Sequence, residues 1–191
     1  MLVKICGITN REDALAAVDA GAGALGFIFY AKSPRATNVE SLRHWIDQVP
    51  AHVLRIGVYV NEAPALIEST AQALGLHVAQ LHGEETPAQH PATGLIWRAL
   101  RVTGDCIAQA DYPADALLLD GPGNGRTFDW KLAAGLPRRV VLAGGLKPGN
   151  VREAIETVRP WAVDTASGVE ASPGRKDHAQ MKKFIETALN S

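Results

Sequence analysis

Residues that could do chemistry stand directly after short apolar runs along this 191-residue chain. The runs of Val, Ile and Leu lead into a thiol, a carboxyl, an amide, an imidazole, a guanidinium or a pair of glycines. In a parallel sheet the carboxyl ends of the strands meet at one edge, where active sites collect. The positions nominated in this way are Cys6, the segment 32–35, Asn61, His82, Arg101, Asp120, Gly144–Gly145 and the segment 164–168.

Cys6 and Asp120 carry the groups that a general base and a general acid need. Cys6 ends the first run, where a thiol is either a small buried apolar group or a base or nucleophile. A thiol of ordinary pKa is only about 3% ionised at pH 7, so a base here needs nearby amides or a cation. Asp120 follows Ala-Leu-Leu-Leu, where partial burial favours the protonated form of a proton donor. The alternative for Asp120 is a turn cap before Gly121.

Two glycine-containing segments after the last two runs predict a phosphate site. Gly144 and Gly145 follow Val-Val-Leu-Ala, and Ser167 and Gly168 follow the final run. Glycine lets backbone N–H groups approach an anion closely, and a helix beginning near Val169 would add its dipole. Each segment alone could be a turn that uses glycine for positive φ. Their place on neighbouring strands favours phosphate.

Arg35 and His82 are candidate substrate contacts. The planar guanidinium of Arg35 suits a carboxylate, although a single arginine is more often a solvated surface charge. His82 follows the fourth run and would contact substrate or hydrogen-bond a backbone carbonyl. No metal-ligand spacing and no nucleotide-binding glycine pattern occurs, so we expect neither a metal nor a nucleotide cofactor. Cys106 is interpreted as incidental.

Composition and charge exclude several classes of protein. Hydrophobic residues make up 47% and charged residues 20%, as in a folded globular protein. Nineteen basic and 20 acidic residues give a formal net charge of −1, with no basic excess for nucleic acid. No apolar stretch is long enough to span a membrane, and charge at Lys4 argues against a signal peptide. Two cysteines are no disulfide framework, so we expect free thiols and a cytoplasmic location.

The apolar runs alternate with helix-like stretches, which predicts an α/β fold with a parallel sheet. About 24 residues are available for each of eight strand–helix units, which suits a single-domain (β/α)8 TIM barrel over residues 1–191. An open doubly wound sheet is the alternative. We predict strands at residues 3–6, 24–29, 54–60, 78–81, 96–101, 116–120, 140–143 and 162–164.

Capping signals place helices between the strands. Thr-x-x-Glu patterns beginning at Thr9 and Thr37 predict capping boxes. Pro64 is expected in a first helical turn and Gly75 just after a last one. We predict helices over residues 13–20, 38–49, 64–74, 148–158 and 176–189, and short helical connections over 86–94 and 104–112.

Taken together, these segments resemble the phosphoribosylanthranilate isomerase family of tryptophan biosynthesis. Matching blocks span nearly the whole chain and include Val3-Lys-Ile-Cys-Gly-Ile-Thr9, Gln80-Leu-His-Gly83 and Ser167-Gly-Val-Glu170. The resemblance implies a (β/α)8 barrel without cofactor or metal, which acts on a small phosphorylated sugar–anthranilate substrate. It leaves monomer and homodimer open.

The resemblance also implies a reaction and a role for each residue. The reaction is the Amadori rearrangement of N-(5-phosphoribosyl)anthranilate to 1-(2-carboxyphenylamino)-1-deoxyribulose 5-phosphate. By position, Asp120 would be the general acid and Cys6 the general base. Arg35 would contact the anthranilate carboxylate, while Asp164 would orient substrate or a neighbouring side chain. The phosphate would be bound by Gly144, Gly145, Ser167 and Gly168.

Departures from the family pattern limit this transfer. Ala166 stands where many relatives have Ser or Asn, so one side-chain contact is missing there. The loop after Asp120 is individual to this chain, so no role is transferred to Asn124 or Arg126.

Two other functions stay open from the residues. One is another phosphosugar barrel, such as an epimerase or the aminoaldose isomerase of histidine biosynthesis, which typically uses two aspartates where this chain has Cys6 and Asp120. The other is a non-catalytic phosphosugar-binding module, because fold alone does not give function.

Overall fold

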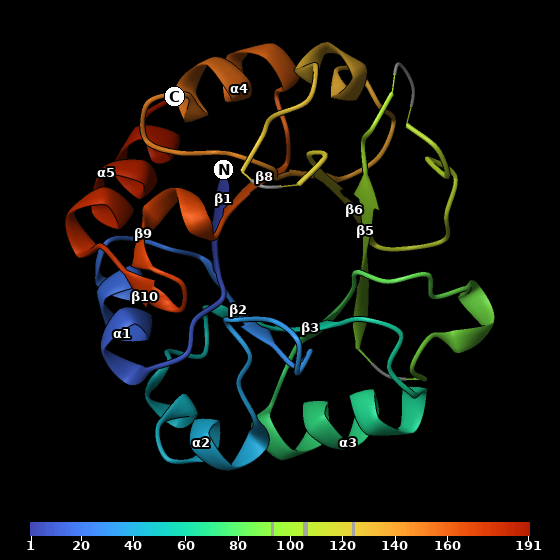
Figure 1. Cartoon of the computed structure of the whole chain (residues 1–191), viewed down its shortest axis with the longest axis vertical. Coiled ribbons are helices and arrows are strands. Elements are labelled where there is room, and N and C mark those ends of the chain that lie inside the picture. Colours follow the sequence, from blue (N-terminus) through green and yellow to red (C-terminus); the bar gives the residue numbers. More distant parts are fainter. Residues whose placement is uncertain (93, 105–106, 124) are drawn as a thin grey trace.

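Eight parallel strands close into a barrel. The structure is a computed structural model that describes residues 1–92, 94–104, 107–123 and 125–191. The strands are hydrogen-bonded in chain order, and β1 pairs with β8 to complete the ring (Figure 1), so the predicted barrel is confirmed and the open sheet is excluded. They are β1 (Leu2–Cys6), β2 (Ala24–Ile28), β3 (Leu54–Tyr59), β4 (Val78–Leu81), β5 (Leu95–Arg101), β6 (Ala116–Asp120), β7 (Val140–Leu142) and β8 (Ala162–Thr165).

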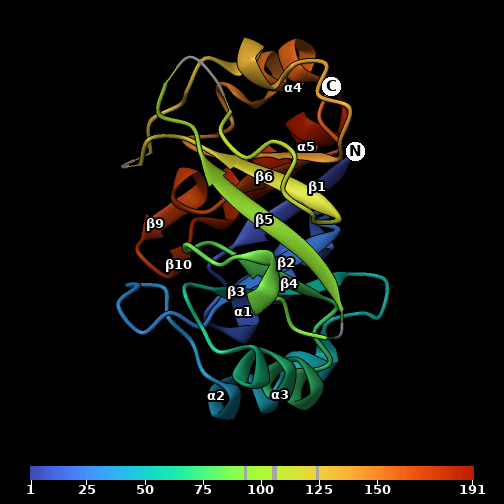
Figure 2. The ribbon, with the colours of Figure 1, turned by 90° about the vertical axis from the view of Figure 1, so that its right-hand side faces the viewer.

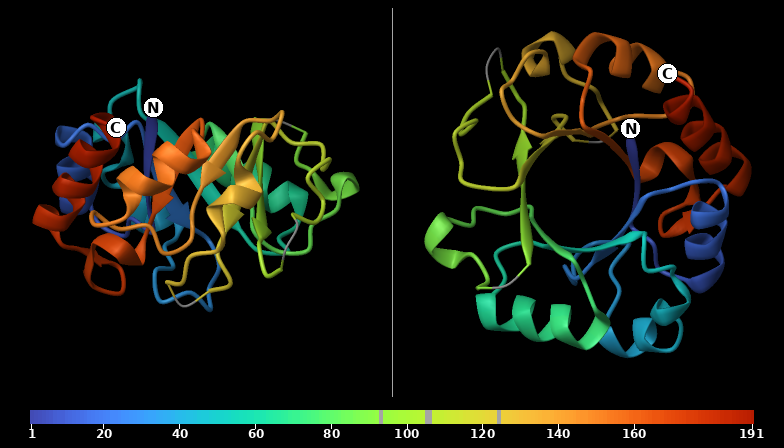
Figure 3. Two further views of the ribbon diagram at one scale, coloured as in Figure 1. Left: turned by 90° about the horizontal axis from the view of Figure 1, so that it is seen from above. Right: turned by 180° about the vertical axis from the view of Figure 1, so that it is seen from behind.

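Helices surround the barrel in both end-on views (Figures 1 and 3). α3 begins at Pro64, and Gly75 ends it in the left-handed conformation at φ 60°, as predicted. In the described ranges the α-helices are α1 (Arg11–Asp19), α2 (Val39–Arg43), α3 (Pro64–Leu74), α4 (Val151–Val158) and α5 (His178–Leu189). Single 3-10 turns stand at Ile46–Gln48, Pro87–Gln89, Trp130–Ala133 and Ser167–Val169.

Few helical residues cover the outside of the barrel beside β5, the strand that faces the viewer in Figure 2. The predicted connection over 86–94 forms only the turn Pro87–Gln89. Over 104–112, the described residues contain turns and no helix. Both segments are short and contain few apolar residues, so they cannot bury a helical face against the barrel.

The predicted capping boxes at Thr9 and Thr37 are wrong by one residue. Asn10 caps α1 and Asn38 caps α2, because each asparagine Oδ1 accepts a 2.9 Å hydrogen bond from an amide three residues later. The second helix is also shorter than predicted, since α2 ends at Arg43 and a separate 3-10 turn follows.

The segment after β8 forms a hairpin that the sequence did not predict. Ser167–Val169 is a single 3-10 turn, so the expected α-helix does not begin there. β9 (Glu170–Ser172) then pairs antiparallel with β10 (Arg175–Lys176). α5 consequently begins at His178, two residues later than predicted.

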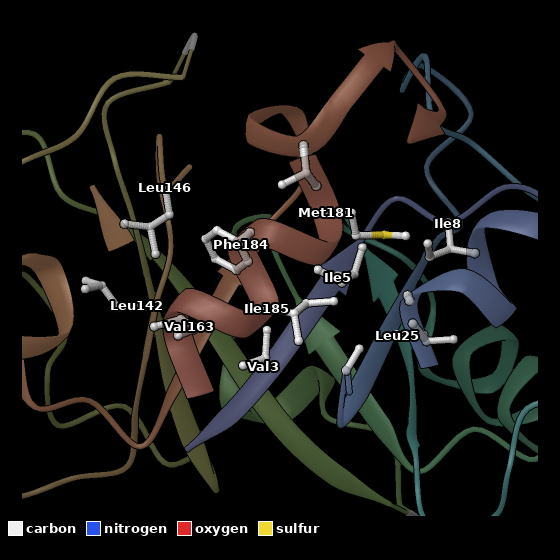
Figure 4. Packing of buried hydrophobic residues seen from close by; sticks show 14 of the residues in the cluster. Val3, Ile5, Ile8, Leu25, Leu142, Leu146, Val163, Met181, Phe184 and Ile185 are labelled. Carbon is white, nitrogen blue, oxygen red and sulfur yellow. The ribbon is translucent and has the colours of Figure 1, made fainter. Parts of the chain in front are cut away.

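The strands have a core on each side. Ala24, Ile56 and Trp97 belong to an apolar cluster inside the barrel. On β1, Val3 and Ile5 belong instead to the cluster that the helices cover, where α5 packs against them (Figure 4). Because side chains alternate along a strand, Lys4 and Cys6 face the barrel interior.

Candidate active site

All nine predicted site residues line one cavity of about 220 Å³ at the carboxyl ends of the strands. The ends of β1, β6, β7 and β8 and the loops after β2 and β4 contribute to its wall. Asn61 and Arg101, which the strand ends also nominated, do not line this cavity. The structure therefore brings together the nine residues for which a catalytic or binding role was predicted. They are Cys6, Arg35, His82, Asp120, Gly144, Gly145, Asp164, Ser167 and Gly168.

Cys6 lies at the end of β1 and is 6% exposed. Burial raises the pKa of its thiol, and Asp164 adds to this rise, while the ammonium of Lys4 opposes it. Lys4 is fully buried and donates a 2.8 Å hydrogen bond to Asp164. The sequence analysis did not select Lys4 as a site residue. The signal available was its spacing, because residues two apart on a strand share a face.

Asp120 ends β6 with 27% of its side chain exposed, so the carboxyl is partly buried as predicted. Its Oδ2 lies 3.5 Å from Nε2 of His82. The amide nitrogen of Gln80 lies 3.2 Å from Nδ1 of the same ring. An Nδ1 that accepts from Gln80 leaves the proton on Nε2, directed toward the carboxyl. His82 thus faces the candidate acid instead of capping a backbone carbonyl.

Arg35 is held from one side by a residue that the sequence analysis gave no role. Nε and Nη2 of Arg35 donate to the two carboxylate oxygens of Glu170 at 2.8 and 2.6 Å. Lys176 donates to the same carboxylate at 3.0 Å. Burial opposes the charged form of Glu170, but Arg35 and Lys176 outweigh it and lower the pKa of the carboxyl. The paired guanidinium still lines the cavity.

The glycine segments present backbone amides to the cavity. Gly144 and Gly145 have φ of 80° and 67°, which permits the tight turn after β7. A Cβ on Gly168 would collide with the carbonyl oxygen of Leu146, so only glycine fits there. Within the described part of the chain, the amides of Gly144, Gly145, Ser167 and Gly168 have no hydrogen-bond acceptor. Four such donors in one wall suit an anion.

The loop after Asp120 closes one side of the cavity. Gly123, Gly125 and Arg126 line it. A Cβ at Gly121 would collide with the carbonyl oxygen of Arg126, and a Cβ at Gly144 would collide with the backbone of Gly121. Arg126, to which no role was transferred, is an additional cation at the rim. Asn124, and Cys106 in the loop after β5, lie outside the described residues.

In the residues that the structure describes, no group of three or more His, Cys, Asp or Glu side chains could hold a metal ion. None of the helices in the same ranges has the length and apolar character needed to cross a membrane.

Comparison with known proteins identifies the family. The family model described as N-(5'phosphoribosyl)anthranilate (PRA) isomerase matches residues 3–187. The chain belongs to this family. The N-(5'-phosphoribosyl)anthranilate isomerase of Solibacter usitatus is 47% identical over 196 residues, which cover 98% of this chain and 97% of that protein. The Pseudomonas fluorescens protein of the same name is 48% identical over 194 residues, or 95% of each chain.

Solved structures of the family agree with the fold. The phosphoribosylanthranilate isomerase of Thermotoga maritima has a TM-score of 0.90 at 43% identity, with both chains fully covered. Another family structure, at 42% identity and a TM-score of 0.88, is a complex with reduced 1-(o-carboxyphenylamino)-1-deoxyribulose 5-phosphate. The family, the barrel and the class of aldose–ketose isomerase predicted from the sequence are confirmed.

Proposed function

We propose that this chain catalyses the Amadori rearrangement of N-(5-phosphoribosyl)anthranilate, a cytoplasmic step of tryptophan biosynthesis, with Asp120 as general acid and Cys6 as general base. Residues 1–191 would act as one catalytic domain. The observation that carries the proposal is the shared cavity, which has the carboxyl at the end of β6, the thiol at the end of β1 and the amides after β7 and β8 in one wall.

Ring opening needs a proton donor at the furanose ring oxygen. Asp120 is partly buried and reaches the cavity, so its carboxyl can give a proton to that oxygen. The C–O bond breaks as the ring oxygen takes the proton, and the nitrogen lone pair forms a protonated Schiff base. His82, which faces the same carboxyl, orients it and would stabilise the carboxylate that remains.

The second step needs a base at carbon 2 of the sugar. The positive Schiff base makes that carbon acidic, and the Cys6 thiolate takes the proton. The electrons of the C–H bond form the enolamine. It becomes the ketone when carbon 1 takes up a proton and the hydroxyl on carbon 2 loses its proton. Cys6 and Asp120 come from different strands, so one group can act on the ring oxygen while the other acts on carbon 2.

The remaining residues would hold the two anionic ends of the substrate. The amides of Gly144, Gly145, Ser167 and Gly168 suit the phosphate. Their N–H groups line one cavity and can bind an anion without a lysine side chain. Arg35 suits the anthranilate carboxylate, since Glu170 pairs with its Nε and Nη2 and leaves Nη1 for the substrate.

The test is the decay of phosphoribosylanthranilate fluorescence, with the substrate generated in situ. We expect the parent chain to accelerate the decay, and Cys6→Ala and Asp120→Asn each to lower kcat by about 100-fold or more. Asp19→Asn, at an exposed position on α1, and Cys106→Ala are controls expected to keep the parent rate. Either catalytic variant turning over at the parent rate would remove the role given to that residue.

A further inference from the structure

A buried ion pair joins two neighbouring strands inside the barrel, next to Cys6. Lys4 and Asp164 are register partners on β1 and β8, and Nζ lies 2.8 Å from Oδ1. The Lys4 side chain is 0% exposed and that of Asp164 is 9% exposed. A buried ion pair adds little stability compared with apolar side chains of the same size, so its presence among Ala, Ile and Trp indicates another use.

The neighbouring strand places the ammonium and the thiol together. Gly26 is the register partner of Cys6 on β2. A Cβ at Gly26 would lie 2.9 Å from the Cys6 Sγ and 3.1 Å from the Lys4 Nζ. Because Gly26 has no side chain, the Cys6 thiol and the Lys4 ammonium both occupy the space that its Cβ would fill. The two groups therefore face one another.

We propose that Lys4 is a positioning residue for the isomerisation: its ammonium, fixed by Asp164, places a positive charge against Cys6 and favours the thiolate. This inference rests on the proposed role of Cys6 as the base. A thiolate, and not a thiol, can accept a proton from carbon, and an adjacent cation stabilises the thiolate. Asp164 then acts through Lys4, and its role is to hold the ammonium in place.

The two members of the pair act on Cys6 in opposite senses. Burial raises the pKa of the thiol, Lys4 lowers it and Asp164 raises it further. Two other charged groups face the same thiol. Lys176, whose Nζ donates to the backbone carbonyl of Cys6 at 2.7 Å, favours the thiolate, and Arg35 interacts with it from the loop after β2. Lys4 is the group whose charge adjoins Sγ from the same strand.

The test titrates the single thiol of a Cys106→Ser background by the ultraviolet absorbance of the thiolate, without substrate. We expect Lys4→Met to raise the pKa of Cys6 so that the thiolate fraction near neutral pH falls about tenfold. Asp164→Asn should change the thiolate fraction in the opposite direction. The limb of the kcat/KM pH profile that reports the titration of the thiol should shift with it in each variant. A purely structural pair would move both variants in the same direction or leave the titration unchanged.

A double variant keeps the test valid if Lys4→Met does not fold. Lys4→Met/Asp164→Asn leaves no unpaired charge, and its comparison with Asp164→Asn isolates the Lys4 ammonium. We expect a lower thiolate fraction in the double variant, whereas an equal fraction overturns the inference. Lys182→Met, at a side chain 66% exposed, is the matched control and should not shift the titration.

The activity of Cys6→Ala is measured separately from the thiol titration. An active Cys6→Ala variant would overturn both the proposed base and this inference, whatever the titration shows. An inactive Cys6→Ala variant with an unchanged titration on removal of Lys4 overturns this inference alone.

Discussion

At the scale of single residues, Arg35 depends on a partner far away in sequence. Glu170 is 135 residues further along the chain and holds two nitrogens of the guanidinium at 2.8 and 2.6 Å. Lys176 and the amide of Gly174 donate to the same carboxylate. This arrangement leaves Arg35 charged, part-buried and fixed in one orientation, as recognition of a planar carboxylate requires.

Glu170→Gln should therefore weaken substrate binding more than catalysis. The amide keeps the size of the side chain but loses the charge-assisted pair, so Arg35 gains freedom at the cavity wall. We expect KM to rise about tenfold, as for the loss of one hydrogen bond between charged groups, with a smaller change in kcat. Glu186→Gln, on an exposed part of α5, is the control and should leave both constants unchanged. A fall in kcat at constant KM would contradict this role for Glu170.

At the scale of elements, one carboxylate joins α1 to the two elements that end the chain. Asp13 on α1 accepts a 2.9 Å hydrogen bond from the backbone amide of Lys176 in β10, and its other oxygen lies 2.8 Å from Nε2 of His178 in α5. Asn10, the cap of α1, also donates to it at 2.8 Å. The position of the β9–β10 hairpin, which lies beside the barrel next to α1 (Figure 1), thus depends on a helix near the other end of the chain.

Asp13→Asn should destabilise the fold at neutral pH by about 1–3 kcal/mol, because buried donors lose an ionised acceptor. Burial opposes ionisation of Asp13, but its hydrogen bonds outweigh burial, so its pKa is lowered in the folded chain. The ionised group therefore adds stability above the unfolded pKa of about 3.9, and this stability is lost as pH falls through the lower folded pKa.

Urea unfolding at a series of pH values measures both effects. The variant should lose less stability than the parent as the solution is acidified below about pH 4. Asp19→Asn, on the exposed side of the same helix, should follow the parent curve. Equal pH dependence of the parent and Asp13→Asn would show that this carboxylate does not link α1 to the hairpin.

At the scale of the whole molecule, closure of the barrel joins the two ends of the chain. β1 pairs with β8, and α5 packs over both through Met181, Phe184 and Ile185 (Figure 4). The same closure sets Lys4 opposite Asp164 and places Cys6 in the cavity with the phosphate-binding amides. The stability of the β1–β8 pairing and the assembly of the site are therefore coupled.

Phe184→Ala should lower the free energy of unfolding by about 3–5 kcal/mol, since the side chain is fully buried and the cavity cannot collapse against two strands. Leu189→Ala, in the same helix but 45% exposed, should cost about 0.5 kcal/mol or less. Far-UV circular dichroism and tryptophan fluorescence should give one unfolding transition for Phe184→Ala, because the closed barrel unfolds as a unit. Two separate transitions would show that the ends of the chain open independently.

Local sequence signals predicted the eight strands, the barrel and nine residues of the cavity wall. Apolar runs and turn residues are local signals, and parallel strands must bring their carboxyl ends to one edge, so Cys6, Asp120 and the glycine segments could be nominated before any coordinates. Family blocks such as Ser167-Gly-Val-Glu170 supplied the reaction, which pattern alone does not give.

Which charged side chains meet could be read from the folded chain alone. Lys4 and Asp164 are 160 residues apart, and Arg35 and Glu170 are 135 apart, so no local pattern relates them. Their pairing follows from the register of β1 against β8 and from the β9–β10 hairpin. The structure has this hairpin where the sequence predicted the start of a helix. Capping was decided in the same way, because neighbouring Thr and Asn side chains both suit a helix start and only the backbone conformation selects between them. Contacts of this kind are set when the barrel closes, and a single sequence contains no periodicity that records them.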